Sequence, residues 1–209
     1  PPPPPAPYTT LFRSPSGMAY RGVQATSVCG IFDLTVAATG MTEKGLKAAG
    51  YSGFEKIYLH PGNHVGYYPG ARPIHMKLLY DSADGRILGA QALGESGVAR
   101  RIDVISSFIQ MGGTVFDLEE AELCYAPQFG ATKDPVNLAG MIAANHLRGD
   151  HPLAKWDELV DTHAQVVEDQ HDASRLLSLI LHDPSQQAQI VDVRTPAEFQ
   201  RKHIEGAIN

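Results

Sequence analysis

Residues 74–93, IHMKLLYDSADGRILGAQAL, constrain the fold of this chain more than any other stretch of its sequence. Two runs rich in aliphatic residues flank a short polar segment from Asp81 to Gly85, a pattern typical of two antiparallel strands joined by a turn. Asp84 and Gly85 are expected to supply the positive-φ positions of that turn. Apolar residues alternate along the first run, so one face of the hairpin is predicted to be buried, by Ile74, Met76 and Leu78.

The sequence around this hairpin alternates between strand and helix patterns. Strands are predicted over 27–37 and 54–60, and helices over 41–51, 94–113, 114–123 and 134–149. The last of these helices has the clearest ends, because Asp134 can cap it, Pro135 fits its first turn and Gly149 can follow its last. Together these elements describe an α+β domain of roughly 125 residues, which is close to the commonest domain size.

Composition excludes several classes of partner. The net charge is -6 and no basic run is present, which argues against binding to nucleic acid or to an anionic membrane. The two cysteines have no CxxC spacing, and this favours a reducing compartment over a disulfide framework or a zinc site. No apolar stretch approaches the roughly 18 residues of a membrane span, and the N-terminus does not resemble a signal peptide. The cytoplasm is therefore the expected location.

Both ends of the chain differ in character from the middle. Residues 1–18 contain a proline run, followed by a segment that looks like a translated sequencing-adapter oligonucleotide, and we expect a non-native or disordered leader there. Residues 190–209 read as a buried strand and a capped helix, after which the chain stops. We therefore expect an α/β domain that is cut short.

Three segments of the middle domain resemble a known family. They are HPGNHVGYYPGARPIHMKLLYD (60–81), ARRIDVISSFIQMG (99–112) and CYAPQFGATKDPVNLAGM (124–141). They are similar to the C-terminal dimerisation domain of the FAD-dependent pyridine nucleotide–disulfide oxidoreductases, in the branch that contains coenzyme A-disulfide reductases and NADH oxidases. The resemblance implies an antiparallel sheet with helices packed on one side, over residues 19–150.

The tail VDVRTPAEFQRKHIEGAIN (191–209) resembles the first third of a rhodanese domain. We therefore expect a linker over 151–170 and a truncated, incomplete α/β rhodanese-like segment over 171–209. The family's persulfide-carrying cysteine would lie beyond Asn209, so sulfur transfer by this chain is not expected. The residues that match the family's opening pattern have structural roles there, and they are Asp192, Arg194, Glu198, His203 and Gly206.

The resemblance implies a parent enzyme that uses FAD and NAD(P)H to reduce coenzyme A disulfide or a persulfide. In the family, tyrosines from this domain reach the flavin and disulfide site of the partner subunit in a homodimer. The matching positions are Tyr67, Tyr68 and Tyr125, which are expected to support catalysis in trans. The fragment alone is expected to bind no cofactor and to be inactive.

Two other functions stay open at this point. One is an NADH oxidase of the same fold, although the rhodanese-like tail favours sulfur chemistry. The other is a purely structural dimerisation module with no residue in the chemistry. In either case the apolar faces of the helices at 97–112 and 134–147 predict a two-fold interface between copies of the chain.

The remaining candidate residues receive structural interpretations. Cys29 and Cys124 are interpreted as small buried side chains, since neither matches the position of the family's redox cysteine. Lys133 is interpreted mainly as part of a helix start. Three histidines could suggest a metal site, but they share no helical face and have no carboxylate at ligand spacing. They are interpreted as loop and strand-surface residues: His60, His64 and His75.

Overall fold

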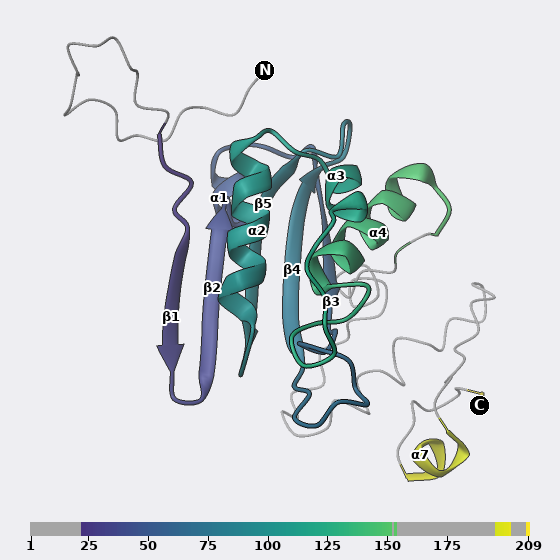
Figure 1. Ribbon diagram of the computed structural model, residues 1–209. Helices are drawn as coiled ribbons and strands as arrows, with labels where there is room; N and C mark the ends of the chain where they lie inside the picture. Colours follow the sequence, from purple (N-terminus) through teal and green to yellow (C-terminus); the bar gives the residue numbers. More distant parts are fainter. Residues whose placement is uncertain (1–21, 152, 154–194, 202–207) are drawn as a thin grey trace, which may run out of the picture. The chain divides into compact units, whose positions relative to one another are not determined.

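The computed structural model describes residues 22–151, 153, 195–201 and 208–209. The chain divides into two units, residues 1–151 and 152–209, and each is described by itself. The first unit is built on one five-stranded antiparallel sheet with the order β1-β2-β5-β4-β3 (Figure 1). The strands are β1 (Ser27–Ile31), β2 (Leu34–Gly40), β3 (Phe54–Leu59), β4 (Ile74–Asp81) and β5 (Ile87–Gly94).

Three helices cover one face of this sheet. They are α2 (Val98–Gln110), α3 (Val115–Glu120) and α4 (Pro135–Arg148). Helix α2 packs over β2 and β5, whereas α4 packs over β3 and β4 and carries α3 on its flank (Figure 1). The predicted fold class, an α+β domain with an antiparallel sheet and helices packed on one side, is confirmed.

The core lies between this sheet face and the helices. Ile74, Met76 and Leu78 of β4 are buried there, as are Ile102 and Ile105 of α2. Tyr80 is also fully buried, and its hydroxyl is satisfied by Nδ1 of His146 in α4 at 2.8 Å. Burial therefore removes a large aromatic surface from water without leaving a polar atom unpaired.

The opposite sheet face is partly covered as well. Helix α1 (Glu43–Ala48) places Leu46 against Leu79 and Leu88 in a small second cluster. Leu79 is therefore buried although it lies on the face opposite to Leu78. The expectation of a single buried face for the hairpin is corrected by this contact, which the alternation within β4 alone does not reveal.

The predicted strand over 27–37 is wrong as a single element. The chain folds back at Phe32 and Asp33, and Ile31 pairs with Leu34 across a two-residue turn. Phe32 adopts a positive φ of 52° and is fully exposed. Two-residue turns of this kind usually contain glycine or asparagine. Phe32 and Asp33 are neither, so the sequence pattern does not indicate a turn at these positions.

The β4–β5 turn differs from its prediction in one detail. Gly85 has a positive φ of 74°, as expected, but Asp84 is not among the residues with positive φ. The turn is closed by the Gly85 N–H, which donates to the Asp81 carbonyl at 3.0 Å, and the Asp84 carboxylate accepts from the Arg86 N–H at 2.9 Å. Asp84 therefore stabilises the turn through its side chain rather than through its backbone conformation.

The predicted ends of α4 are confirmed, whereas α3 starts where predicted but ends at Glu120, three residues before the predicted 123. Helix α4 begins at Pro135 behind the N-cap Asp134 and ends at Gly149, whose φ is 78°. Helix α3 has Thr114 as its N-cap, in a capping box with Asp117. These side chains satisfy backbone N–H groups that the first turn of a helix leaves unpaired.

In the second unit the structure describes helix α7 (Pro196–Arg201). Its start agrees with the predicted pattern, because the Thr195 hydroxyl and N–H both donate to the Glu198 carboxylate, at 2.6 and 3.1 Å. Asp192, Arg194, His203 and Gly206 lie outside the described residues, as do the predicted leader and most of the predicted linker.

Candidate functional site

Two loops at one end of the sheet bring the predicted tyrosines together. The first loop, residues 60–73, joins β3 to β4, and the second, residues 121–134, joins α3 to α4. The hydroxyls of Tyr67 and Tyr125 lie 3.4 Å apart although 58 positions separate them in the chain. Both side chains are open to solvent, with exposed fractions of 76% and 43%. We call this arrangement the tyrosine pair.

Tyr68 has a different environment. Its ring meets that of His64 edge-on, with 5.6 Å between the ring centroids, and its N–H donates to the Val65 carbonyl at 3.2 Å. His64 itself is buried, with Nδ1 at 3.0 Å from that same carbonyl. The interpretation of His64 as a loop residue agrees with its position between β3 and β4, and the structure adds that its side chain is buried. The structure brings Tyr67 and Tyr125 into contact and sets Tyr68 against His64.

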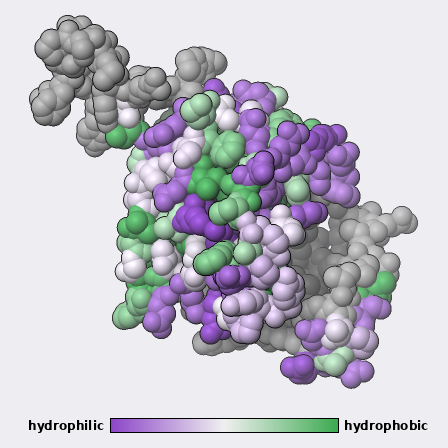
Figure 2. All heavy atoms as spheres, viewed as in Figure 1, coloured by the Kyte–Doolittle hydropathy of each residue, from purple (hydrophilic) through white to green (hydrophobic). Residues whose placement is uncertain are grey.

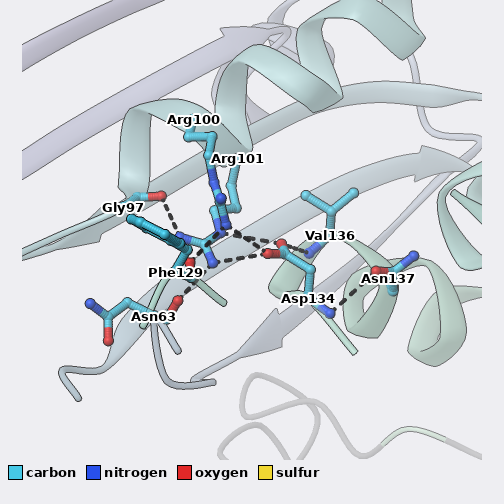
Figure 3. Close-up of polar contacts among 8 residues, drawn as sticks. All are labelled: Asn63, Gly97, Arg100, Arg101, Phe129, Asp134, Val136 and Asn137. Carbon is cyan, nitrogen blue, oxygen red and sulfur yellow. Dashed lines mark hydrogen bonds and ion pairs between the residues drawn. The ribbon is translucent and has the colours of Figure 1, made fainter. Parts of the chain in front are cut away.

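A buried ion pair connects the two loops to the helices (Figure 3). Arg101 of α2 is 2% exposed, and it donates to the carboxylate of Asp134 from Nε at 3.2 Å and from Nη2 at 2.9 Å. The same Nη2 donates to the Asn63 carbonyl in the first loop at 2.7 Å. Arg100 extends the connection to the second loop, since its Nη2 donates to the Phe129 carbonyl at 3.2 Å and to Asp134 at 3.1 Å.

Each partner of this ion pair also stabilises backbone nearby. Asp134 caps α4 by accepting from the Val136 N–H at 3.1 Å, and Arg101 Nη1 donates to the Gly97 carbonyl at 3.0 Å. Gly97 is required there for two reasons. Its φ is 75°, and a Cβ atom at this position would lie 2.2 Å from Arg101 Nη1. The paired charges are therefore fully hydrogen-bonded, which buried charges need in order to be tolerated.

A direct contact between the loops completes the arrangement. The Val65 N–H of the first loop donates to the Gly130 carbonyl of the second at 3.1 Å. The first loop is also closed on itself, because the Asn63 side chain accepts from the Arg72 N–H at 2.8 Å. The backbone of the two loops is thus fixed by polar contacts. The phenol rings of the tyrosine pair stay accessible to solvent.

The electrostatics of the pair favour the protonated phenol. The hydrogen bond with Tyr67 raises the pKa of Tyr125 above its ordinary value. A phenol that keeps its proton at neutral pH is a hydrogen-bond donor, and two adjacent donors can stabilise an anion such as a thiolate. The arrangement can therefore bind and orient an anionic group.

A concave region lies at the β4–β5 turn, away from the tyrosine pair. It encloses about 540 Å³ and is lined by Tyr51, Gly53, Asp81, Ser82, Ala83, Asp84 and Arg86. Its polar groups pair with one another, because the Tyr51 hydroxyl donates to Asp81 and Arg86 forms an ion pair with the same carboxylate at 3.3 Å. This internal pairing indicates that the region mainly stabilises the turn.

The other candidate residues are placed as follows. Cys29 and Cys124 are both exposed, so their interpretation as buried side chains is wrong. Cys29 lies on β1, an edge strand whose five residues are all exposed, and Cys124 lies in the second loop. No group of three or more histidine, cysteine or acidic residues that could hold a metal ion occurs within the described part of the chain.

Sequence reasoning missed the residues that hold the loops. Arg101 lies in a helical pattern beside Arg100, where a charged residue is normally expected at the surface. Asp134 is predicted as a helix cap, but its pairing with Arg101 depends on contacts between elements that are far apart in sequence. The signal that could have indicated it is the spacing of Arg101, three residues after Val98 and four before Ile105, which places it on the apolar face of α2.

Comparison with known proteins identifies the class to which this fold belongs. The model of the pyridine nucleotide-disulphide oxidoreductase dimerisation domain matches residues 26–135, which is more than half of the chain. The chain therefore belongs to the pyridine nucleotide-disulphide oxidoreductase family. A rhodanese-like domain model matches residues 172–209. Both parts of the resemblance derived from the sequence are confirmed.

Several relatives of this chain carry the name of one specific enzyme within this family. The chain is 34% identical over 125 residues to a coenzyme A disulfide reductase of Staphylococcus epidermidis, and the match covers 60% of this chain and 28% of that protein. A coenzyme A disulfide reductase of Staphylococcus aureus is 36% identical over 121 residues, covering 58% and 27%. The chain thus spans under a third of the length of these relatives.

Two solved structures with similar folds agree with this assignment. Reduced Bacillus anthracis CoADR-RHD is 36% identical with a TM-score of 0.74, and the match covers 93% of this chain and 31% of the other. An NAD-dependent persulfide reductase from A. fulgidus is 35% identical with a TM-score of 0.61, covering 63% of this chain and 24% of the other.

Among the described residues, no helix is both long enough and apolar enough to cross a membrane.

Proposed function

We propose that this chain is the dimerisation portion of an NAD(P)H-dependent flavoprotein that reduces coenzyme A disulfide or a related persulfide. The observation that carries the proposal is the tyrosine pair, which presents two exposed hydroxyl groups from loops fixed by buried contacts. The family and the names of the relatives supply the reaction class. The rhodanese-like match supports sulfur chemistry.

The reaction consumes one NAD(P)H and one proton and converts a disulfide into two thiols. FAD, NAD(P)H and coenzyme A would be bound by the parent protein. The sequence of this chain holds no GxGxxG phosphate loop, so no step of electron transfer is assigned to its residues. The role that we propose for these residues is to stabilise the negative charge that forms on sulfur when the disulfide bond breaks.

In this proposal the tyrosine pair acts in trans, at the active site of the partner subunit in a homodimer. The hydroxyls of Tyr67 and Tyr125 donate hydrogen bonds to the thiolate that leaves when the disulfide bond breaks. Tyr68 supports the first loop through its contact with His64. Because both donors are held before the reaction, little reorganisation is needed when the charge forms.

The surface supports the homodimer on which this role depends. Hydrophobic side chains gather on the helical face of the first unit (Figure 2). Helices α2 and α4 leave several large apolar residues half-buried there, namely Phe108, Ile109, Leu138, Met141 and Ile142. A second copy that covers them would remove this surface from water, as expected for an isologous interface.

The decisive experiment replaces Tyr125 and Tyr67 by phenylalanine in the full-length protein that carries this chain. We expect kcat for coenzyme A disulfide to fall by about tenfold or more for each, as when a pre-positioned hydrogen-bond donor is removed. The control is Tyr58→Phe, since Tyr58 is an exposed tyrosine on the sheet. Unchanged turnover in both variants, with the dimer intact, would favour the purely structural dimerisation module instead.

A further inference from the structure

Two histidines on neighbouring strands face each other at the edge of the sheet. His60 directly follows β3, and His75 is the second residue of β4. Leu59 is paired with Met76, so continuing the antiparallel register outward sets His60 opposite His75. Their Nδ1 atoms are 2.7 Å apart, and their ring centroids are separated by 4.8 Å. Both side chains are exposed.

The backbone explains why the two rings come so close. The Ile74 N–H donates to the Pro61 carbonyl at 2.7 Å, so residues 61 and 74 form a hydrogen-bonded pair. In an antiparallel ladder the neighbouring pair, His60 and His75, is then of the non-hydrogen-bonded type, in which side chains approach most closely. Strand register, and not a flexible loop, therefore sets the separation of the two nitrogens.

At this distance the two Nδ1 atoms must share one proton in a hydrogen bond. One Nδ1 donates and the other accepts, so at least one ring is neutral. If both rings carry their protons on Nε2, the two Nδ1 lone pairs converge on one point in solvent. That is the donor set of a bidentate metal chelate, in which a metal ion replaces the shared proton.

We propose that His60 and His75 form a binding site for a divalent transition-metal ion that prefers imidazole, of the Cu²⁺ or Ni²⁺ type. With metal–nitrogen bonds of about 2.0–2.1 Å, two ligands at a right angle lie about 2.9 Å apart, so the nitrogens need to separate by only about 0.2 Å. A tetrahedral zinc ion requires about 3.4 Å and a larger movement. Water would complete the coordination, because the pair is exposed.

The surroundings of the pair are compatible with a dication. On the same sheet face Lys77 is the nearest strand neighbour with a charge, and it is engaged with the Glu43 carboxylate and lies over the ring of Tyr58. On the next strand His75 is opposite Leu93, which is apolar. The proposal is independent of the tyrosine pair and does not rest on the proposed function.

The test is calorimetric titration of the untagged 209-residue chain with Cu²⁺ and with Ni²⁺, in a non-coordinating buffer at pH 7.5. His60→Gln and His75→Gln each remove one ligand and keep a polar side chain at the surface. The matched control is His151→Gln, which changes an exposed histidine outside the sheet. Circular dichroism of each variant verifies that the fold is retained.

We expect one site per chain whose affinity falls by about tenfold or more in each of the two pair variants, and not in the control. The metal should also raise the melting temperature of the unaltered chain, because the unfolded state lacks the preformed chelate. Equal affinity in all four proteins would overturn the proposal. So would a Cu²⁺ electron paramagnetic resonance spectrum that shows one coordinated nitrogen or none.

Discussion

The tyrosine pair shows how much the chemistry of a residue depends on a neighbour that is distant in sequence. Tyr125 alone would be an ordinary exposed phenol. In contact with Tyr67 its pKa is raised, and the proton that a hydrogen-bond donor needs is kept over a wider pH range. The pairing is therefore a property that can be measured before any substrate is present.

We predict that Tyr67→Phe lowers the pKa of Tyr125 back toward 10.0, because it removes the hydrogen bond that raises it. The measurement is a pH titration of the Tyr125 ring carbon followed by NMR with selectively labelled tyrosine. Tyr58→Phe serves as the control and should leave this titration unchanged. A Tyr125 titration that is identical in the Tyr67→Phe variant would show that the two phenols do not interact in solution.

A second prediction concerns Glu43 in α1. Its ion pairs with Lys47, at 2.8 Å, and with Lys77 lower the pKa of its carboxyl group from 4.5 to about 2. Because the folded-state pKa is depressed, the stabilisation is fully present above pH 4.5 and is lost as the pH falls toward 2. We expect Glu43→Gln to reduce the free energy of unfolding by about 1–2 kcal/mol at pH 7, after allowance for screening of Lys47 by water.

The measurement is urea denaturation at several pH values. The stability difference between Glu43→Gln and the unaltered chain should narrow as the pH falls below 4.5, where the native carboxyl group begins to lose its advantage. Glu122→Gln, an exposed substitution in the second loop, provides the baseline. A difference that stays constant down to pH 2.5 would contradict the assigned cause.

Single residues also show where sequence reasoning was sufficient and where it was not. Asp134, Pro135 and Gly149 mark the ends of α4 because capping acts over a few positions along the chain. The burial of Arg101 could not be predicted in the same way, since its partners Asp134 and Asn63 are 33 and 38 positions away. Contacts of this kind arise from tertiary structure, and no local pattern encodes them.

At the scale of elements, the Arg101–Asp134 pair is the connection between two helices and two loops. We predict that Arg101→Met lowers the free energy of unfolding by about 3 kcal/mol, since it leaves the Asp134 charge buried with less compensation. The variant should also return the Tyr125 titration toward its ordinary range, because the loops lose their common support. Arg148→Met is the control, as its ion pair with Glu119 lies at the surface.

Denaturation and NMR titration of the same samples separate the two effects. A variant that is less stable but keeps the altered Tyr125 titration would show that the ion pair stabilises the fold without positioning the loops. Arg101→Lys restores the positive charge but not the forked geometry of the guanidinium group. We therefore expect Arg101→Lys to recover part of the lost free energy of unfolding. We expect the Tyr125 titration to stay close to its ordinary range in this variant.

The contact between α3 and α4 depends on a glycine. A Cβ atom at Gly140 would lie 2.3 Å from the Glu119 nitrogen and 2.7 Å from the Leu118 carbonyl carbon. We predict that Gly140→Ala lowers the free energy of unfolding by about 1–3 kcal/mol through overpacking, although alanine normally favours a helix. Gly66→Ala is the matched control, because nothing lies within 4 Å of the added atom there. Thermal denaturation of both variants decides between packing and propensity.

At the scale of the whole first unit, most of the sheet and its helices followed from local patterns. The β4–β5 hairpin and the starts of α3 and α4 are all encoded by residues near one another in sequence. The strand order was not encoded in this way, because β2 pairs with β5 across 49 to 59 positions of the chain. The family resemblance implied an antiparallel sheet but not its strand order, which came from the structure. The resemblance did point to Tyr67, Tyr68 and Tyr125 before the contact between Tyr67 and Tyr125 was known.

The whole molecule is predicted to associate as a homodimer. We expect sedimentation equilibrium of the 209-residue chain to give twice the monomer mass at micromolar concentration. Met141→Glu and Ile142→Glu would place charges on the half-buried apolar surface of α4 and should weaken association by more than tenfold. Glu122→Gln is again the control. Association that is unaffected by both substitutions would place the interface elsewhere.

The strand order has a consequence for how the first unit opens. Within the sheet the hairpin of β1 and β2 is hydrogen-bonded to the other strands through β2 and β5, and α2 packs over β2, while β3, β4 and β5 are consecutive neighbours. Such a peripheral hairpin can detach as one cooperative unit while the three-stranded remainder keeps its hydrogen bonds. Amide protons of β2 should therefore exchange with solvent deuterium sooner than those of β4. Proteases should cleave first near Phe32, in the turn of this hairpin, and the cut would separate β1 from β2 while β2 stays joined to the rest of the chain.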